Sequence, residues 1–192
     1  NGIEFGGSFR ADQAGDSVLD NGAAYGSEGS VYVSGAFGKI EMGDTVSAPE
    51  ALFGDLPEVG YTDLATANGL DNDIPYLTGD SHDLLGMGVS DITGPGNPEL
   101  LYTYSAGAFS IAASMSDGNG ANNPMFAAAD AQEYALAAAY TFQNYTVGLG
   151  YEVIDFTGGT FAQGELAGVA TFGNTNVKAY YAWGDQDWVV DQ

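Results

Sequence analysis

The sequence predicts an all-β protein, an antiparallel transmembrane β-barrel, and three observations lead to that prediction. Segments with one apolar or aromatic face and one small or polar face recur through most of the 192 residues. Short turns alternate with longer polar loops between these segments, and aromatic residues gather at the segment ends beside the short turns. Strands of about 9–11 residues, unequal connections and aromatic girdles are together typical of membrane barrels.

We expect nine strands, because nine segments alternate between apolar and polar side chains with a period of two. In chain order, the expected strands are residues 2–12, 30–37, 40–44, 98–105, 109–116, 132–142, 145–155, 165–172 and 176–185. Tight hairpin turns are expected at Gly38-Lys39, Ala106-Gly107, Gln143-Asn144 and Gly173-Asn174-Thr175. Longer loops are expected near residues 13–29, 45–97, 117–131 and 156–164.

The strand expected at residues 132–142 illustrates the two faces. Its apolar face consists of Tyr134, Leu136, Ala138, Tyr140 and Phe142, and its other face of Glu133, Ala135, Ala137, Ala139 and Thr141. A soluble β-sandwich would alternate in the same way, since antiparallel sheets commonly bury one face. The regular rotation of short turns and long loops favours the membrane barrel, in which the apolar face contacts lipid and the other face lines water.

The composition excludes several classes of function. Acidic residues number 26 and basic residues 3, which gives a net charge of −23. Binding to a phosphate backbone needs lysine and arginine, so nucleic acid is excluded as a partner. Cysteine is absent, which excludes thiol catalysis, thiolate metal sites and disulfides. The chain is 45% apolar, which predicts a folded rather than a disordered protein.

The stretch at residues 45–97 interrupts the alternation. It holds nine acidic residues, no lysine or arginine, and the only histidine, His82. Ser47 and Glu50 fit a capping box, with Pro49 early in a helix and Gly54 at its end, so a short helix is expected at about residues 48–53. An apolar and acidic loop of this kind could fold against the inner wall of a barrel, where carboxylates would set the ion preference of a pore.

Blocks of sequence along nearly the whole chain resemble one family of membrane proteins. The blocks are "SGAFGKIEMGD", "EALFGDL", "EVGYTDL", "NDIPYLTGD", "LLYTYSAGAFS", "AAYTF" followed by "NYTVGLGYE", and "NVKAYYA". In this order they are similar to the general diffusion porins of the outer membrane, of the Rhodobacter (alpha-proteobacterial) type.

The resemblance implies a 16-stranded porin-type barrel in the bacterial outer membrane. It further implies a homotrimer that contacts outer-membrane lipid and lipopolysaccharide. The implied function is passive, weakly cation-selective diffusion of ions and small hydrophilic solutes through a water-filled pore. The stretch at 45–97 would be the third loop of such a barrel, folded inward to narrow the pore.

The chain departs from the family in length. Family members begin with two further strands and continue beyond the last strand seen here. We therefore expect residues 1–192 to form one domain, an incomplete porin barrel that covers the third to eleventh strands. Nine strands cannot close such a barrel, and an open sheet in lipid would leave backbone edges unpaired.

The resemblance also implies a pore constriction, in which acidic loop residues face basic residues of the wall. Arg10 aligns with a wall lysine of the family, whereas Lys39 is expected to be a solvated charge in a turn. Lys178 is expected to face the lumen without a special role. The expected constriction residues are Arg10, Glu50, Asp55, Glu58, Asp63, Asp73 and Asp80.

Calcium is a further expectation from the resemblance, because many carboxylates in one loop repel each other unless a cation offsets them. Glu50, Asn72 and Asp80, with the carbonyl of Ile74, stand at the matching positions, although Glu50 is equally explained by the capping box. His82 has no partner for triad or metal chemistry, so the protein is not expected to be an enzyme. The alternative function is a soluble or cell-surface calcium-binding β-protein without channel activity.

Overall fold

The computed structural model describes residues 2–9, 29–54, 76–78, 99–119, 130–156 and 159–188. Within these ranges the chain forms a single antiparallel sheet whose nine strands follow one another in sequence order. The strands are β1 (Glu4–Phe9), β2 (Gly29–Gly35), β3 (Gly38–Gly43), β4 (Glu99–Ala106), β5 (Phe109–Asn119), β6 (Asp130–Phe142), β7 (Tyr145–Phe156), β8 (Gly159–Phe172) and β9 (Thr175–Trp188). The expected up-and-down order of nine strands is confirmed.

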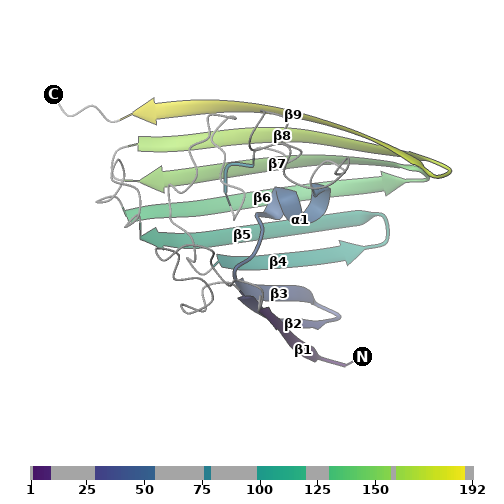
Figure 1. Cartoon of the computed structure of the whole chain (residues 1–192), viewed down its shortest axis with the longest axis horizontal. Helices are drawn as coiled ribbons and strands as arrows, with labels where there is room; N and C mark the ends of the chain where they lie inside the picture. Colours follow the sequence, from purple (N-terminus) through teal and green to yellow (C-terminus); the bar gives the residue numbers. More distant parts are fainter. Residues whose placement is uncertain are drawn as a thin grey trace, which may run out of the picture.

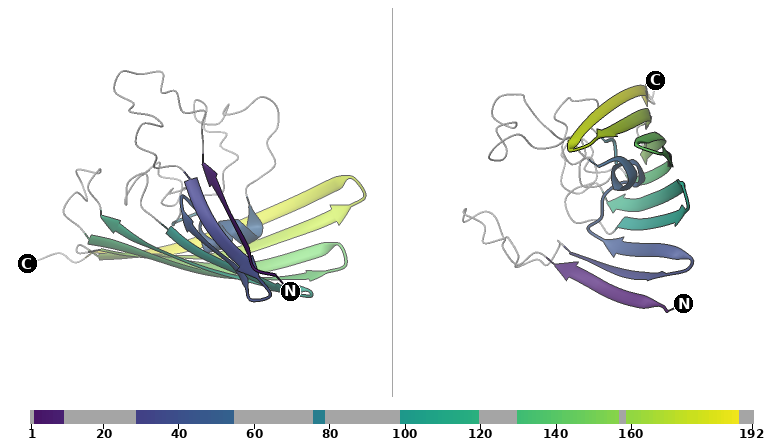
Figure 2. Two further views of the ribbon diagram at one scale, coloured as in Figure 1. Left: turned by 90° about the horizontal axis from the view of Figure 1, so that it is seen from below. Right: turned by 90° about the vertical axis from the view of Figure 1, so that its right-hand side faces the viewer.

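The sheet is curved and not closed. Its strands form an open trough with β1 and β9 at the two edges, and one short helix, α1 (Ala48–Phe53), lies on the concave side (Figures 1 and 2). Within the described ranges, no helix is long and apolar enough to cross a membrane.

Several expected strand boundaries and turns are wrong by one to six residues. The turn between β2 and β3 is Ala36-Phe37 and not Gly38-Lys39, because Gly38 and Lys39 already pair with β2. The turns after β4 and β8 are Gly107-Ala108 and Gly173-Asn174, and the turn at Gln143-Asn144 is as expected. The long loop expected at 156–164 does not exist, since β8 begins at Gly159 and pairs there with the end of β7.

The convex face of the sheet is apolar and exposed. From β5 to β7, the register aligns Ile111 with Ala138, and Ala138 with Leu149, so that their side chains lie on one face. Exposed members of this face are Phe5, Val31, Met42, Ile111, Met115, Leu136, Val147, Leu149, Tyr151, Leu166, Val177 and Tyr181. A contiguous apolar surface of this kind is typical of a face that contacts lipid.

Aromatic side chains border this face beside the hairpin turns. Phe109 packs against Tyr140 at 4.6 Å between ring centroids, and Tyr145 packs against Phe172 at 6.1 Å. The hydroxyl of Tyr102 donates a 2.7 Å hydrogen bond to the carbonyl of Phe37 in the β2–β3 turn. These amphipathic rings form the girdle that the sequence predicts at the turn end of the strands.

The hydrophobic core lies on the concave side, between α1 and the wall. Its buried members are Ala48, Phe53, Tyr76, Leu101, Ala112, Ala135, Ala137, Ala139 and Ala167. A Cβ atom at Gly148 would overlap the Phe53 ring, and one at Gly150 would meet Pro49. The small residues of β5 to β7 on this face therefore form the seat on which the helix packs.

Candidate functional site

The helix α1 forms where the sequence predicts it. Ser47 is the N-cap, and its hydroxyl accepts a 3.3 Å hydrogen bond from the amide of Glu50. Pro49 occupies the first turn, where its missing N–H costs no hydrogen bond. Gly54 ends the helix with a φ of 61°, a left-handed conformation that favours glycine, and its amide donates to the Glu50 carbonyl.

The start of α1 is fastened to the middle of the wall. The amide of Ala48 donates a 3.0 Å hydrogen bond to the Ser114 hydroxyl on β5. Just before the helix, the Thr45 hydroxyl donates a 3.2 Å hydrogen bond to the Glu99 carboxylate on β4. All four residues are buried, so these bonds satisfy polar groups that would otherwise be costly to remove from water.

The end of α1 is held by a lysine from the wall. The Lys178 ammonium on β9 donates hydrogen bonds to the carbonyls of Phe53 and Gly54. These carbonyls are among those that a helix C-terminus leaves without an intrahelical partner, and a cation there also interacts favourably with the helix dipole. The hydroxyl of Tyr76 donates a 2.9 Å hydrogen bond to the same Gly54 carbonyl.

A second short piece of the inward stretch, residues 76–78, lies on the wall beside the helix end. The Glu152 carboxylate on β7 accepts hydrogen bonds from the Leu77 amide at 2.6 Å, the Thr78 amide at 3.2 Å and the Thr78 hydroxyl at 2.8 Å. The ring of Tyr76 meets that of Tyr180 edge-on at 5.6 Å between centroids. All three residues of the piece are buried, as is Glu152.

The wall around these contacts is rich in carboxylates. Buried glutamates of this region are Glu50, Glu99, Glu133, Glu152 and Glu165. Gln163 donates a 3.2 Å hydrogen bond to the Glu165 carboxylate, and the register places Gln163 directly opposite Glu152. A buried charge is costly unless it is paired or hydrogen-bonded, and Glu99 and Glu152 accept hydrogen bonds from the inward stretch.

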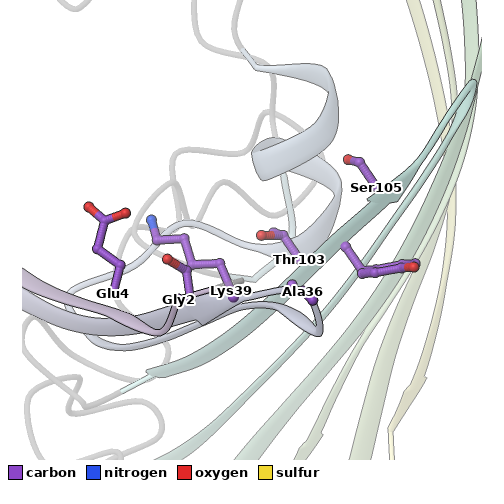
Figure 3. Close-up of a pocket in the computed structure, with 10 residues that line it drawn as sticks. Gly2, Glu4, Ala36, Lys39, Thr103 and Ser105 are labelled. Carbon is purple, nitrogen blue, oxygen red and sulfur yellow. The ribbon is translucent and has the colours of Figure 1, made fainter.

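A polar recess lies on the concave side near the β2–β3 and β4–β5 turns. It measures about 510 Å³ and is lined by Gly2, Glu4, Ser34, Gly35, Ala36, Gly38, Lys39, Thr103, Tyr104 and Ser105. Glu4 and Lys39 project from the strands toward the side on which α1 lies (Figure 3). Lys39 forms an ion pair with Glu41 and lies 4.9 Å from the centre of the Tyr32 ring.

Two sequence expectations about lysines are therefore wrong. Lys39 does not lie in a turn; it lies in β3, half-buried on the inner face, opposite Thr103. Lys178 faces the concave side as expected, but it has a specific role as the cap of α1. Sequence reasoning also missed Glu152 and Ser114 as contacts of the inward stretch. For Glu152, the available signal was an acid that follows Gly148 and Gly150 on the inner face of β7; Ser114 is one of several serines on the inner face of β5 and gave no such signal.

The predicted site residues fall mostly outside the described ranges. Glu50 is described: it lies in the first turn of α1 and is buried. Residues outside the described ranges are Arg10, Asp55, Glu58, Asp63, Asn72, Asp73, Ile74 and Asp80. Within the described part of the chain, no three potential metal-ligating acids or histidines lie together. The constriction and calcium sets remain predictions.

Comparison with known proteins gives consistent matches. A family model described as Gram-negative porin matches residues 1–190. A porin of Rhodobacter capsulatus is 57% identical over 190 residues, which are 97% of this chain and 56% of that protein. A solved porin structure superposes with a TM-score of 0.74 at 56% identity, over 95% of this chain and 56% of the other. The chain thus spans about half the length of the relatives that it matches.

Proposed function

The chain belongs to the Gram-negative porin family, and from that premise we propose that the protein containing it is a passive, weakly cation-selective diffusion channel. The described sheet is part of a porin β-barrel of the bacterial outer membrane. Ions and small hydrophilic solutes would cross through a water-filled pore, and the inward stretch that begins at residue 45 would narrow it. The observation that carries the proposal is α1, seated on the concave wall rather than on the lipid face.

The two faces of the sheet support a division between lipid and water. The convex face exposes large apolar side chains such as Leu136, Leu149 and Tyr181, which would be unfavourable in water and favourable against acyl chains. The concave face carries hydroxyls, carboxylates and small residues. A soluble or cell-surface β-protein, the alternative function, does not fit such an exposed apolar face, nor the family.

The charge of the inward stretch supports the cation preference. The helix α1, which carries Glu50, packs on the concave side, and residues 55–75, which follow it in sequence, are rich in carboxylates. Carboxylates in a narrow pore attract cations and repel anions. The constriction residues would be Glu50, Asp55, Glu58, Asp63, Asp73 and Asp80 on the inward stretch, with Arg10 on the opposite wall.

Calcium is part of the proposal. Glu50 offers a buried carboxylate, and carboxylate, amide and carbonyl oxygens are the ligands that calcium prefers. Glu50, Asn72, Asp80 and the carbonyl of Ile74 would hold the ion. The bound ion would supply positive charge that offsets the repulsion among the carboxylates of the inward stretch.

The assembly is also proposed from the family. The full-length protein would be a homotrimer surrounded by outer-membrane lipid and lipopolysaccharide, and it would act as a channel and not as an enzyme.

Planar-bilayer recording of the full-length protein tests the channel. We expect discrete, long-lived openings and a reversal potential that indicates weak cation preference. Replacing Asp55, Glu58 and Asp63 together by asparagine should shift the reversal potential toward anions. The absence of discrete openings would refute the channel, and an unchanged reversal potential would remove these three residues from the constriction.

A further inference from the structure

Three side chains hold residues 53–54 and 76–78 of the inward stretch on two strands of the wall, and we infer that they act as a clamp that fixes the pore width. The clamp consists of Lys178 on β9, Glu152 on β7 and Tyr76 between them. The inference rests on the proposed channel for its effect on current. It makes Lys178 and Glu152 positioning residues, which act on permeating ions through the chain that they hold.

The first step is that two pieces of the inward stretch, one at Gly54 and one at Tyr76, are in contact. The Tyr76 hydroxyl reaches the Gly54 carbonyl at 2.9 Å, although 22 residues separate the two in sequence. Tyr76 is fully buried and its ring also contacts Tyr180 on β9. Gly54 and Tyr76, which flank residues 55–75 in sequence, are therefore held together at one point of the wall.

The second step is that the two pieces are held by side chains of opposite charge, Lys178 at Gly54 and Glu152 at residues 77–78. At Gly54 the chain offers carbonyl oxygens, and the wall supplies the Lys178 ammonium, a donor. At Leu77 and Thr78 the chain offers amides and a hydroxyl, and the wall supplies the Glu152 carboxylate, an acceptor. Hydrogen bonds to an ionised group are about twice as strong as those between neutral groups. Lys178 and Glu152 should therefore hold Gly54 and residues 77–78 strongly on the wall.

The third step concerns where the clamp sits in the sheet. Glu152 lies opposite Gln163 of β8, and Lys178 lies opposite Val169 of the same strand, so the two charges are in strands on either side of β8. The clamp therefore spans three neighbouring strands. Four of the proposed constriction acids (Asp55, Glu58, Asp63 and Asp73) lie in sequence between Gly54 and Tyr76, so we expect release of either attachment to change the pore that these acids are proposed to line.

Hydrogen exchange tests the clamp without reference to current. In the full-length protein, Glu152→Ala should speed exchange of the Leu77 and Thr78 amides at least about tenfold, since each loses a bond to a charged acceptor. Glu152→Gln keeps an oxygen acceptor and should give an intermediate rate. Glu4→Ala is the matched control, because it removes a carboxylate from the same face without touching residues 76–78.

The exchange result has clear contrary outcomes. Unchanged exchange at Leu77 and Thr78 in Glu152→Ala would overturn the clamp. Equal acceleration of the α1 amides of Ala51 and Gly54, which bond within the helix, would also overturn it, because the wall would then have loosened as a whole.

Current recording tests the other end. Lys178→Met should at least double the variance of the open-channel current, because the end of α1 would no longer be held, whereas Lys178→Arg should restore a quiet trace. Lys39→Met removes the same charge from the inner face away from α1, so it should shift the mean current but leave the variance unchanged. Equal variance in Lys178→Met and Lys39→Met would overturn the clamp. A wild-type protein without openings would refute the proposed channel, while the exchange result would still decide the clamp.

Discussion

The contact between Phe53 and Gly148 gives the most direct test of how α1 is seated. Phe53, the last residue of the helix, is buried and lies over Gly148 of β7, where a Cβ atom would overlap its ring. Replacing Gly148 with valine puts three carbon atoms into the space that the ring occupies. Since Gly148 is strand backbone held by β6 and β8, the ring and the helix end must move instead.

The size of the effect follows from the packing. Adding carbon atoms to a well-packed core costs about 1–3 kcal/mol. Valine also has less conformational entropy than glycine in the unfolded chain, and this stabilises the folded protein by about 0.4–1 kcal/mol. Gly148→Val should therefore lower the free energy of unfolding by about 1 kcal/mol, the difference between the middles of the two ranges. Phe53→Ala alone should cost about 3–5 kcal/mol, because it empties a buried site.

Equilibrium unfolding in denaturant, from detergent or lipid, measures these changes. In the double variant the ring that valine displaces is gone, so the combined cost should fall short of the sum by about 0.5–3 kcal/mol. Gly168→Val is the matched control, because no atom lies within 4 Å of a Cβ built at Gly168. In bilayers, Gly148→Val should also lower the open-channel conductance, since a raised helix end narrows the pore.

Two results would refute this reasoning. Additive costs in the double variant would mean that Phe53 and Gly148 do not compete for space. A Gly148→Val variant as stable and as conductive as Gly168→Val would mean that the helix is not seated on this glycine.

Three further predictions concern the cap, the lipid face and calcium. Ser47→Ala should lower the free energy of unfolding by about 1 kcal/mol through loss of the N-cap, and Ser47→Asp should keep it; equal losses would contradict the capping role. Leu149→Arg should cost about 2–4 kcal/mol if the convex face meets the bilayer core, and Thr146→Arg on the concave face much less; equal costs would reverse the assignment of the faces. Calcium at a hundredfold excess over its dissociation constant should raise unfolding stability by about 2.7 kcal/mol relative to a chelator; no difference, measured by thermal unfolding, would remove the metal from the proposal.

The strand pattern was predictable from the sequence because lipid on one side and water on the other impose a period of two along every strand. The errors have local causes. Gly38 suggested a turn, yet it starts β3 with a positive φ of 104°, at a point where a side chain would strike the Thr103 carbonyl of β4. The segment of β8 before Glu165 reads as a polar, glycine-rich loop, but Phe161 and Gln163 there face inward and are buried.

The site was predictable only where its chemistry is local. The cap of α1 depends on Ser47, Pro49, Glu50 and Gly54, which are neighbours in sequence. The wall contacts depend instead on which strands the inward stretch crosses, and no local pattern encodes that. Lys178 is separated from Phe53 by 125 residues and Glu152 from Leu77 by 75, so their roles appear only when the sheet is folded.

The concave face shows why a small-residue pattern has two meanings in a barrel. Alanine and glycine on an inner face leave room for water, and the sequence favours that interpretation for all of β6 and β7. In the structure, Ala135, Ala137 and Gly148 are buried beneath α1, so their small size makes room for protein. The polar recess of Glu4, Lys39, Thr103 and Ser105 lies away from this seat and is open. Enlarging a small residue beneath α1 should therefore disturb the helix. Changing a charge in the polar recess should instead alter permeation without moving the helix.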